Sequence, residues 1–382
     1  MKTHLFILIL LLGCLWGACS EQQNSSAECW YIDIEKDYPK LDLSLQDLAE
    51  VHYIPLETDS IFLVSSGKIV CSTNNNIAFI DNKTGNILVY SLKSGKKDFV
   101  INRKGGGPEE YLVIGSVVLD EKNLHVYAWS IMEGVIKVYD KNGNYIQTLP
   151  LRNYKKGDYL YLTNMIDFGE YILCSQNRRG GPTIHYLLNK EIPGKTILLD
   201  SVPSQKVVDI YLQNKKNNVI SSVSPEVTPT TKNENYTILA DYSCDTIYSI
   251  DNQNLVKKPY IVRTPSTQLL PCNKILNYDG ECDDWIFLTS IELTYDFNTK
   301  EGLHKKHYGL QKTTKKIYEI SLLNSDFINS QYIELSKKNY FFKTYDLKKE
   351  NQSKLICNEK LNNMVDSLDE EDNGIIMVTK IN

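Results

Sequence analysis

The segment of this sequence best suited to ligand chemistry is a glycine-rich stretch with a cationic start, RKGGGPEEY at residues 103–111. Three consecutive glycines allow backbone N–H groups to face a ligand, and the Arg–Lys pair would attract an anion. It is not a nucleotide-binding P-loop, because no Lys-Ser/Thr pair follows a G-x-x-x-x-G. The candidate ligand-binding residues are Arg103, Lys104, Gly105, Gly106, Glu109, Glu110 and Tyr111. The alternative is a structural turn, in which the glycines supply positive φ and a proline ends strand pairing.

A second cationic turn, NRRGGP at residues 177–182, places Arg178 and Arg179 beside two more glycines. We expect this turn between the second and third strands of a sheet, on the same face of the molecule as residues 103–111. Two cationic turns on one face would suit an acidic saccharide or a carboxylate. Solvated turns that bind no ligand are the alternative interpretation.

No motif indicates a metal site, a cofactor site or a catalytic centre. His304 and His307 are separated by two lysines, which disfavour a metal cation, so we expect a polar insertion there. The acidic runs lack the spacing of a calcium loop, and no two cysteines have C-x-x-C spacing. Neither a G-x-S-x-G elbow nor an H-E-x-x-H motif is present. We therefore expect no metal, no cofactor and no assignable catalytic residue.

The elements that would position these turns are short strands. Residues 102–152 contain four apolar runs separated by the turn signals EKN, EG and NGN, as is typical of consecutive strands. The gaps are too short for crossover helices, so each strand must pair with the preceding one. This stretch is therefore predicted to be a four-stranded antiparallel meander.

The rest of the chain repeats this meander. Runs aligned on its second strand start at Asn76, Leu124, Glu170, Tyr236, Trp285 and Ile375, and runs aligned on its third strand carry Tyr90, Tyr139, Tyr186, Tyr248 and Tyr318. The first three second-strand runs start 48 and 46 residues apart (124 − 76 and 170 − 124). A period of about 40–50 residues built from four strands is typical of a propeller blade.

The uneven count of second and third strands predicts how the ring closes. The sixth blade would lack its outer strands because the chain ends soon after residue 375, and two N-terminal runs, 29–36 and 51–58, would supply them. The predicted fold is all-β: a six-bladed β-propeller of four-stranded antiparallel blades, closed by N-terminal strands that complete the last blade. Residues 43–51 are predicted to contain a short helical turn, and 203–235 and 294–315 long loops.

The first nineteen residues have the pattern of a targeting segment. An apolar run too short for a mature membrane span ends in small residues directly before Cys19, which we predict to be lipidated. Cys14 is a second candidate, and an ordinary cleaved signal is the alternative. This divides the chain into a signal peptide (1–19), a polar tether (20–28) and the propeller (29–382).

The charge and cysteine content of the chain limit its expected partners and disulfides. The net charge is −5 and no basic stripe stands out, so nucleic acid is not an expected partner. Seven cysteines follow the targeting segment, an odd number that cannot pair fully. Cys272 and Cys282 flank a loop, and the sequence leaves open whether they form a disulfide.

Four segments carry a resemblance to a known family: LSLQDLAEVHYIPLET near the start, INRKGGGPEEY, IKVYDKNGNYI and EEDNGIIMVTKIN at the end. They resemble the six-bladed, NHL-like β-propeller lipoproteins of Gram-negative gut bacteria, over nearly the whole mature chain. The resemblance implies a lipid-anchored propeller of the cell envelope, at the outer membrane and either periplasmic or surface-exposed. It implies no established catalytic activity.

The function expected from these observations is a non-enzymatic binding module. A glycan, peptide or protein would dock on the rim formed by the two cationic turns, and the acyl anchor would hold the protein at a membrane. Two alternatives stay open: a propeller hydrolase or lyase acting on polysaccharide, and a scaffold without a small ligand.

Overall fold

The computed structural model describes residues 29–381, except 59–63, 65–68, 82, 155–159, 179–181, 204–209, 215–218, 226–229, 242–243, 268–272 and 329–338. Several predictions lie outside these residues: the signal peptide, the lipidation of Cys19, the polar tether 20–28, and the positions of Arg179 and Cys272. Cys282 is described and carries a free thiol.

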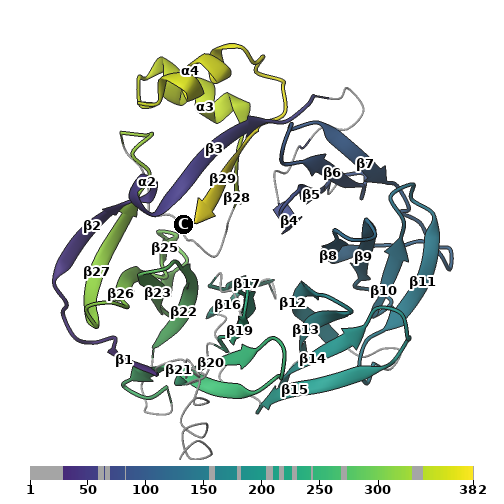
Figure 1. Cartoon of the computed structure of the whole chain (residues 1–382), viewed down its shortest axis with the longest axis horizontal. Coiled ribbons are helices and arrows are strands. Elements are labelled where there is room, and N and C mark those ends of the chain that lie inside the picture. Colours follow the sequence, from purple (N-terminus) through teal and green to yellow (C-terminus); the bar gives the residue numbers. More distant parts are fainter. Residues whose placement is uncertain are drawn as a thin grey trace, which may run out of the picture.

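Six small sheets stand around a common axis, so the predicted six-bladed β-propeller is confirmed (Figure 1). In the first five blades the four meander strands pair antiparallel in chain order, from the axis outwards. Blade one contains β4 (Ile69–Ser72), β5 (Asn76–Ile80), β6 (Ile87–Ser91) and β7 (Lys97–Ile101). Blade two contains β8 (Ile114–Asp120), β9 (His125–Ser130), β10 (Val135–Tyr139) and β11 (Tyr145–Pro150). Blade three contains β12 (Leu160–Phe168), β13 (Tyr171–Arg178), β14 (Thr183–Asn189) and β15 (Thr196–Val202).

Blades four and five follow the same plan with insertions. Blade four contains β18 (Thr230–Lys232), β19 (Tyr236–Leu239), β20 (Thr246–Asp251) and β21 (Lys257–Thr264). Blade five contains β22 (Lys274–Glu281), β23 (Trp285–Glu292), β26 (Lys305–Gln311) and β27 (Lys316–Leu323). The described strands of blade six are β28 (Asn339–Phe342), β29 (Ile375–Ile381) and the N-terminal β3 (Ala49–Pro55).

Ring closure uses one N-terminal strand, not two. β3 pairs antiparallel with β29 and joins the two ends of the chain in one sheet, as predicted for 51–58. The assignment of residues 29–36 to blade six is wrong, because β1 (Trp30–Asp33) adds a fifth strand to blade four, parallel to β21. A further strand, β2 (Lys40–Ser44), pairs parallel with β27 of blade five. The N-terminal segment thus runs around the outside of three successive blades (Figure 1).

The rank of β29 within its blade also differs from the prediction. β3 leads into the first strand of blade one, just as β7 leads into β8, so β3 holds the fourth place and β29 the third. The alignment of residue 375 with the second strands is therefore wrong. The predicted short helix is present as α2 (Leu45–Leu48), and Ser44 caps it without a side-chain hydrogen bond to the backbone.

Both predicted long loops contain strands. The segment 203–235 carries a hairpin of β16 (Ile210–Asn214) and β17 (Val219–Val223), and 294–315 carries a small hairpin, β24 (Tyr295–Asp296) and β25 (Glu301–Gly302). The second loop was predicted wrongly in its second half, where β26 is the third strand of blade five. The third-strand tyrosine of that blade is accordingly Tyr308, and Tyr318 belongs to the fourth strand.

The third-strand tyrosines of blades two, three and five tie their blades to a neighbouring segment of the chain. Tyr139 is fully buried, and its hydroxyl donates to the carbonyl of Glu109, 2.8 Å away, in the loop arriving from blade one. Tyr186 accepts from the backbone N–H of Arg152 after blade two. Tyr308 does the same for the N-terminal segment by donating to the Ile34 carbonyl. Because a buried hydroxyl needs a partner, these bonds fix the spacing of adjacent blades.

Candidate functional site

The loop 103–111 joins the last strand of blade one to the first strand of blade two. Its final residue, Tyr111, is fully buried between the two blades, and its hydroxyl lies 3.0 Å from the Gly85 carbonyl and 3.3 Å from the Ile101 carbonyl. Its ring meets that of Tyr139 edge to face at 5.9 Å. Burial raises the pKa of the Tyr111 phenol to about 12, so this side chain stays neutral and structural at physiological pH.

Most other polar groups of the loop are also held by the protein. The Nε of Arg103 donates to the Gly143 carbonyl at 2.6 Å, and the Gly107 N–H donates to Glu110 at 2.8 Å. A Cβ at Gly105 would lie only 2.0 Å from the Glu110 carboxylate, so a larger residue there would displace that side chain from the Gly107 N–H. The loop is therefore a rigid connection, and its arginine and second glutamate serve its own geometry.

Three of the predicted binding residues remain available on the surface. Lys104, Gly106 and Glu109 are exposed, and nothing lies within 4 Å of a Cβ built on Gly106. Just beyond the loop, Leu112 and Val113 are 48% and 49% exposed. Val113 accepts a hydrogen bond from the residue next to the exposed Met132, so these apolar side chains share one edge of the disc.

The second cationic turn is only partly described. Arg178 is the last residue of β13, where its backbone pairs with Leu160, and its side chain lies outside the described residues. The turn does fall between second and third strands, as predicted. In an antiparallel meander, second-to-third connections emerge at the same end as connections from one blade to the next. Both predicted turns therefore belong to one face.

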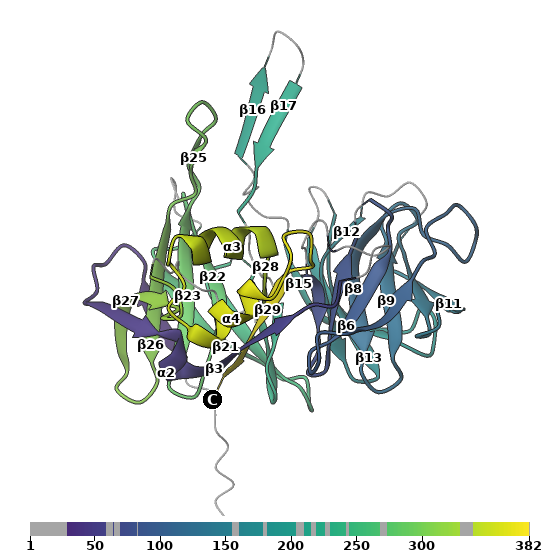
Figure 2. The same ribbon diagram turned by 90° about the horizontal axis from the view of Figure 1, so that it is seen from above.

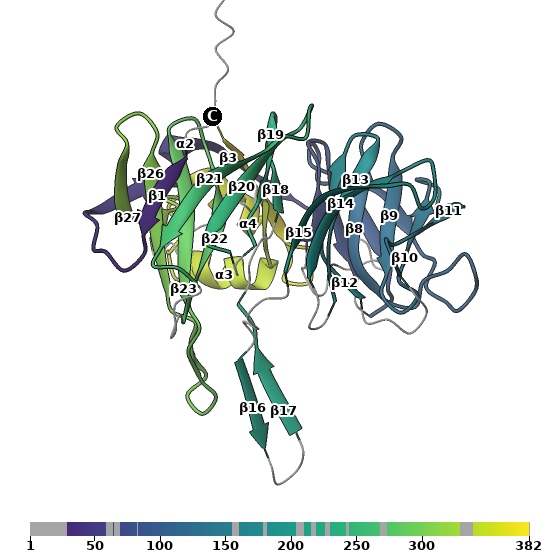
Figure 3. The same cartoon turned by 90° about the horizontal axis from the view of Figure 1, so that it is seen from below.

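Two hairpins of the described chain project from that face, and a helical insertion stands at the outer edge of blade six (Figures 1 and 2). The β16–β17 hairpin lies between blades three and four, and β24–β25 lies between the second and third strands of blade five. Both project from the disc on the same side (Figures 2 and 3). Two helices, α3 (Thr344–Gln352) and α4 (Glu359–Asp366), form the corresponding connection in blade six. We call this side the hairpin face.

The helical insertion was not predicted from the sequence. A signal was present. Leu361 and Val365 are four residues apart and both are buried, as expected of one face of a helix. Asn358 precedes them and caps α4 by accepting from the Leu361 N–H at 3.0 Å. α3 itself gave no such signal, because its residues are mostly polar.

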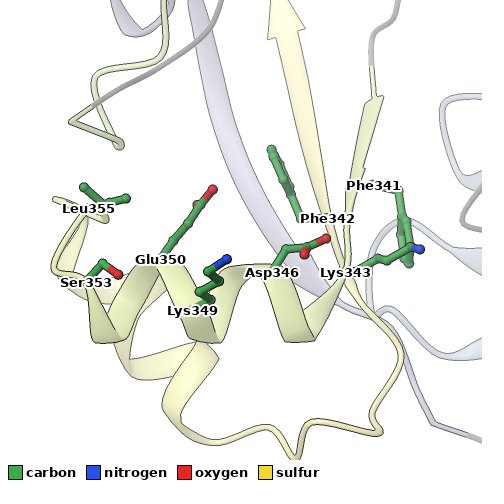
Figure 4. A pocket seen from close by; sticks show the side chains of 8 residues that line it. All are labelled: Phe341, Phe342, Lys343, Asp346, Lys349, Glu350, Ser353 and Leu355. Atoms are coloured by element: carbon green, nitrogen blue, oxygen red, sulfur yellow. The ribbon is translucent and has the colours of Figure 1, made fainter.

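A cavity of about 560 Å³ opens between α3 and the end of β28. It is lined by two aromatic residues, four charged residues and two others: Phe341, Phe342, Lys343, Asp346, Lys349, Glu350, Ser353 and Leu355 (Figure 4). Figure 4 shows the Glu350 carboxylate and the Phe342 ring extending from α3 and β28 into the same space. The volume lies within the range of small-ligand pockets, about 300–1,000 Å³.

The charged groups of this cavity make no ion pair with one another or with the other residues that the structure describes. Within the described part of the chain, Lys343, Asp346, Lys349 and Glu350 have no side-chain hydrogen bond or ion pair. Burial raises the pKa of the Glu350 carboxyl, and the neighbouring Asp346 carboxylate raises it further. Two carboxylates one helical turn apart repel each other, so a bound cation would stabilise both.

The remaining chemistry-bearing residues form no further site. His307 is in β26 and bonds Thr289 Oγ1 at 2.7 Å, so it belongs to a blade rather than to a polar insertion. Among the described residues, no group of three His, Cys, Asp or Glu side chains is placed to hold a metal ion. No helix in the same residues is long and apolar enough to cross a membrane.

Comparison with known proteins supplies a family and a fold. An exported protein from Bacteroides fragilis, provisionally described as such, has a solved structure that matches with a TM-score of 0.58 and 14% identity, over 93% of this chain and 100% of that one. A member of the DUF4221 family from Bacteroides vulgatus matches with a TM-score of 0.47 and 9% identity, over 88% and 99%. At these identities the likeness concerns the fold alone. No curated protein sequence matches. The sequence profile of a domain of unknown function, DUF4934, matches residues 31–380, and the chain belongs to that family.

Proposed function

We propose that this protein is an exported, lipid-anchored binding protein that takes up a short peptide, or another zwitterion of that size, in the cavity beside α3. The single observation that carries the proposal is the set of unpaired charges around that cavity. Lys343, Asp346 and Lys349 are exposed and Glu350 is half-buried, so both carboxylates and both ammonium groups are accessible to a ligand in the cavity.

The chemistry of the lining favours a ligand with both charges. An ammonium group would be stabilised by Asp346 and Glu350 and by the face of the Phe342 ring. A carboxylate would be stabilised by Lys343 and Lys349, which are exposed and stand at the mouth of the cavity. A neutral glycan would use neither pair, so of the glycan, peptide or protein ligands expected from the sequence the lining favours a peptide.

The location is consistent with this use. The cavity lies beside α3, which Figure 1 shows at the outer edge of blade six beyond β3, and the loop 103–111 exposes Lys104 and Glu109 at the connection from blade one to blade two. We extend the proposal to a partner or a longer ligand that reaches that loop. Lys104 is the residue to test there, because truncating Arg103 would also break its hydrogen bond to Gly143.

Export and anchoring rest on the N-terminal sequence and on the resemblance to NHL-like lipoproteins. The cysteine at position 19 follows an apolar run and two small residues, and multiple acyl chains hold a protein at a membrane surface. Mass spectrometry of the mature protein tests this. Acylation lost in Cys19→Ser but kept in Cys14→Ser is the expected result, and an unmodified Cys19 contradicts the proposal.

Peptide binding is tested by calorimetry on the protein from Ser20 onward, with Ala-Phe as the probe. N-acetyl-Ala-Phe lacks the ammonium group and Ala-Phe amide lacks the carboxylate, so each removes one half of the proposed recognition. Each modified probe should bind at least tenfold more weakly than Ala-Phe itself, equivalent to about 1.4 kcal/mol.

The matched variants separate the two halves. Glu350→Gln should weaken the binding of Ala-Phe but not change the binding of N-acetyl-Ala-Phe, which has no ammonium group to lose. Glu359 is an exposed acid on α4 outside the cavity, so Glu359→Gln should change the binding of neither probe. Equal binding of all three probes, or a Glu359→Gln effect as large as that of Glu350→Gln, would refute the assignment. Hydrolysis of the peptide would indicate an enzyme instead.

A further inference from the structure

The interface between blades three and four is built differently from the other five. Each of the others is filled by an apolar cluster of seven or more buried residues, for example thirteen between blades two and three. The buried apolar residues that face one another across blades three and four belong to no such cluster: Leu173, Leu187, Leu239 and Ile250. Among the described residues, this is the interface with the least apolar packing.

Polar groups take the place of the missing cluster. Cys174 and Tyr186 of blade three pack towards blade two, so their strand neighbours Ser175 and His185 point the other way, towards blade four. From the facing side, Ile238 and Ala240 pack towards blade five, so Asp241 points back towards blade three. Ser175, His185 and Asp241 are all buried.

His185 is the group in this interface that lacks a full set of partners. Its side chain is fully buried, and its Nδ1 lies 2.9 Å from the Ser175 hydroxyl. Its Nε2 has no hydrogen-bond partner among the described residues. Buried polar atoms without a partner are rare and mark places where the structure is not at its most stable arrangement.

Three charged groups lie around this ring. Asp200 comes from the neighbouring strand of the same blade, opposite His185 in the register, and it pairs with Lys257 of blade four at 2.9 Å. Asp241 faces the ring from blade four. The Tyr248 ring lies under Lys257, at 4.4 Å from its Nζ. A second proton on His185 would create a buried cation whose Nε2–H lacks an acceptor while the blades are closed.

We propose that the interface between blades three and four is the point at which the ring opens, and that protonation of His185 opens it. Separation of the two blades hydrates the imidazolium. It also frees the connection between them, which carries the β16–β17 hairpin. Acidification is thereby transmitted to the hairpin face.

The direction of the pH effect follows from the burial of this ring. Burial lowers the pKa of His185, and Asp241 and Asp200 oppose that shift only in part. In the open state the pKa returns to its ordinary value, about 6.5, so the open state binds the proton more tightly. The closed interface is thus fully stable above that value and loses stability as the pH falls through the lower pKa of the closed state.

Hydrogen exchange on the protein from Ser20 onward tests the proposal, with protection factors at pH 7.5 and 5.5 corrected for the intrinsic exchange rates. If His185 stays neutral in the closed state and has its ordinary pKa in the open state, lowering the pH from 7.5 to 5.5 raises the opening constant by up to about tenfold. The loss of protection should appear in β13, β14, β19 and β20 and not in blade two.

Two variants identify the residue responsible. His185→Gln retains a partner for Ser175 and cannot titrate, so the pH-dependent loss should disappear. His307→Gln is the matched control, because His307 also precedes a third-strand tyrosine and bonds a second-strand hydroxyl through Nδ1, but is only half-buried. The loss should persist in it. A uniform change in all blades, or an unchanged loss in His185→Gln, would overturn the proposal. If His185→Gln does not fold, histidine NMR of the wild type decides: His185 titrating at its ordinary value with unchanged protection overturns it as well.

Discussion

The substitution Lys190→Met should reveal how strongly blades two and three are joined by one buried ammonium. Lys190 follows β14, and its Nζ lies 2.8 Å from Asp120 at the end of β8 and 2.6 Å from Asp167 in β12. It also stands 5.4 Å from the centre of the Tyr127 ring. The lysine and Asp120 side chains are only 6% and 7% exposed, whereas Asp167 is 37% exposed.

The magnitude follows from what the substitution leaves behind. Removing one partner of a buried ion pair destabilises a protein by about 3–5 kcal/mol, because the other charge stays buried. Asp120 keeps its hydrogen bonds from the Lys122 and Asn123 N–H groups, and Asp167 can turn to water, so we expect the lower end, about 3 kcal/mol. With about 2.1 cal/mol/K per residue over roughly 350 residues, this corresponds to a Tm lower by about 4 °C.

Guanidinium unfolding followed by tryptophan fluorescence is the assay. The control Lys195→Met removes an exposed lysine from the same turn and should change stability by less than about 0.5 kcal/mol. The double variant Asp120→Asn with Lys190→Met removes both charges and should recover most of the loss. A single variant within 1 kcal/mol of the wild type, or a double variant as unstable as the single, would refute the reasoning.

The pH dependence gives a second check. Burial opposes ionisation of Asp120, but the bond and charge of Lys190 outweigh it, so the pKa of Asp120 lies below its ordinary value. This stabilisation is present above the ordinary pKa, about 3.9, and is lost as pH falls through the lower folded value. Without the ammonium the buried carboxyl should be protonated more easily. The difference between variant and wild type should therefore shrink on acidification from pH 7 to about 4.

Three further predictions concern the joints of the ring. Tyr139→Phe removes a buried hydroxyl bonded to the incoming loop and should lower the free energy of unfolding by about 1–2 kcal/mol, measured by denaturant unfolding; no change would show that the bond is dispensable. Gly95→Ala should cost about 2–5 kcal/mol, because its φ is +68° and the new Cβ would lie 1.9 Å from a β3 carbonyl. Gly194→Ala is the control: Gly194 has φ +80° and nothing within 4 Å of a Cβ, so this variant should lose only about 1–2 kcal/mol of unfolding free energy. Equal losses in the two variants would show that the contact with β3 does not matter. Deleting β1 and β2 should leave a folded but less stable ring, whereas deleting β3 as well should abolish cooperative melting; circular dichroism and thermal melts distinguish them, and a cooperative melt without β3 would show that another strand closes the ring.

The repeat and its closure could be predicted because they depend on patterns every blade must satisfy. Alternating apolar runs at a period near 47 residues define the meander, and a ring must join its ends. The partner of a given strand could not be predicted. The first N-terminal run has the composition of a strand, but nothing in it distinguishes an antiparallel place in blade six from a parallel place beside β21.

The same limit applies to rank within a blade and to the site. Tyr318 follows an isoleucine in an apparent strand run, whereas Tyr308 follows two lysines and a histidine, so the sequence favoured Tyr318 as the third-strand tyrosine although the inserted β24–β25 hairpin leads to Tyr308. The loop 103–111 was predicted as one unit, and its close packing depends on contacts with other blades that local sequence does not encode. The cavity joins α3 to β28 across the end of a sheet, and no single motif spans it.

The two parallel strands added outside blades four and five have a mechanical consequence. Any tension on the chain before Trp30 reaches β1 first and then β2, and it is transmitted to β3 only after both have detached. β3, the strand that closes the ring, therefore carries no load until β1 and β2 have both detached. A tethered copy of this protein would yield in steps at its periphery while the disc itself stays intact.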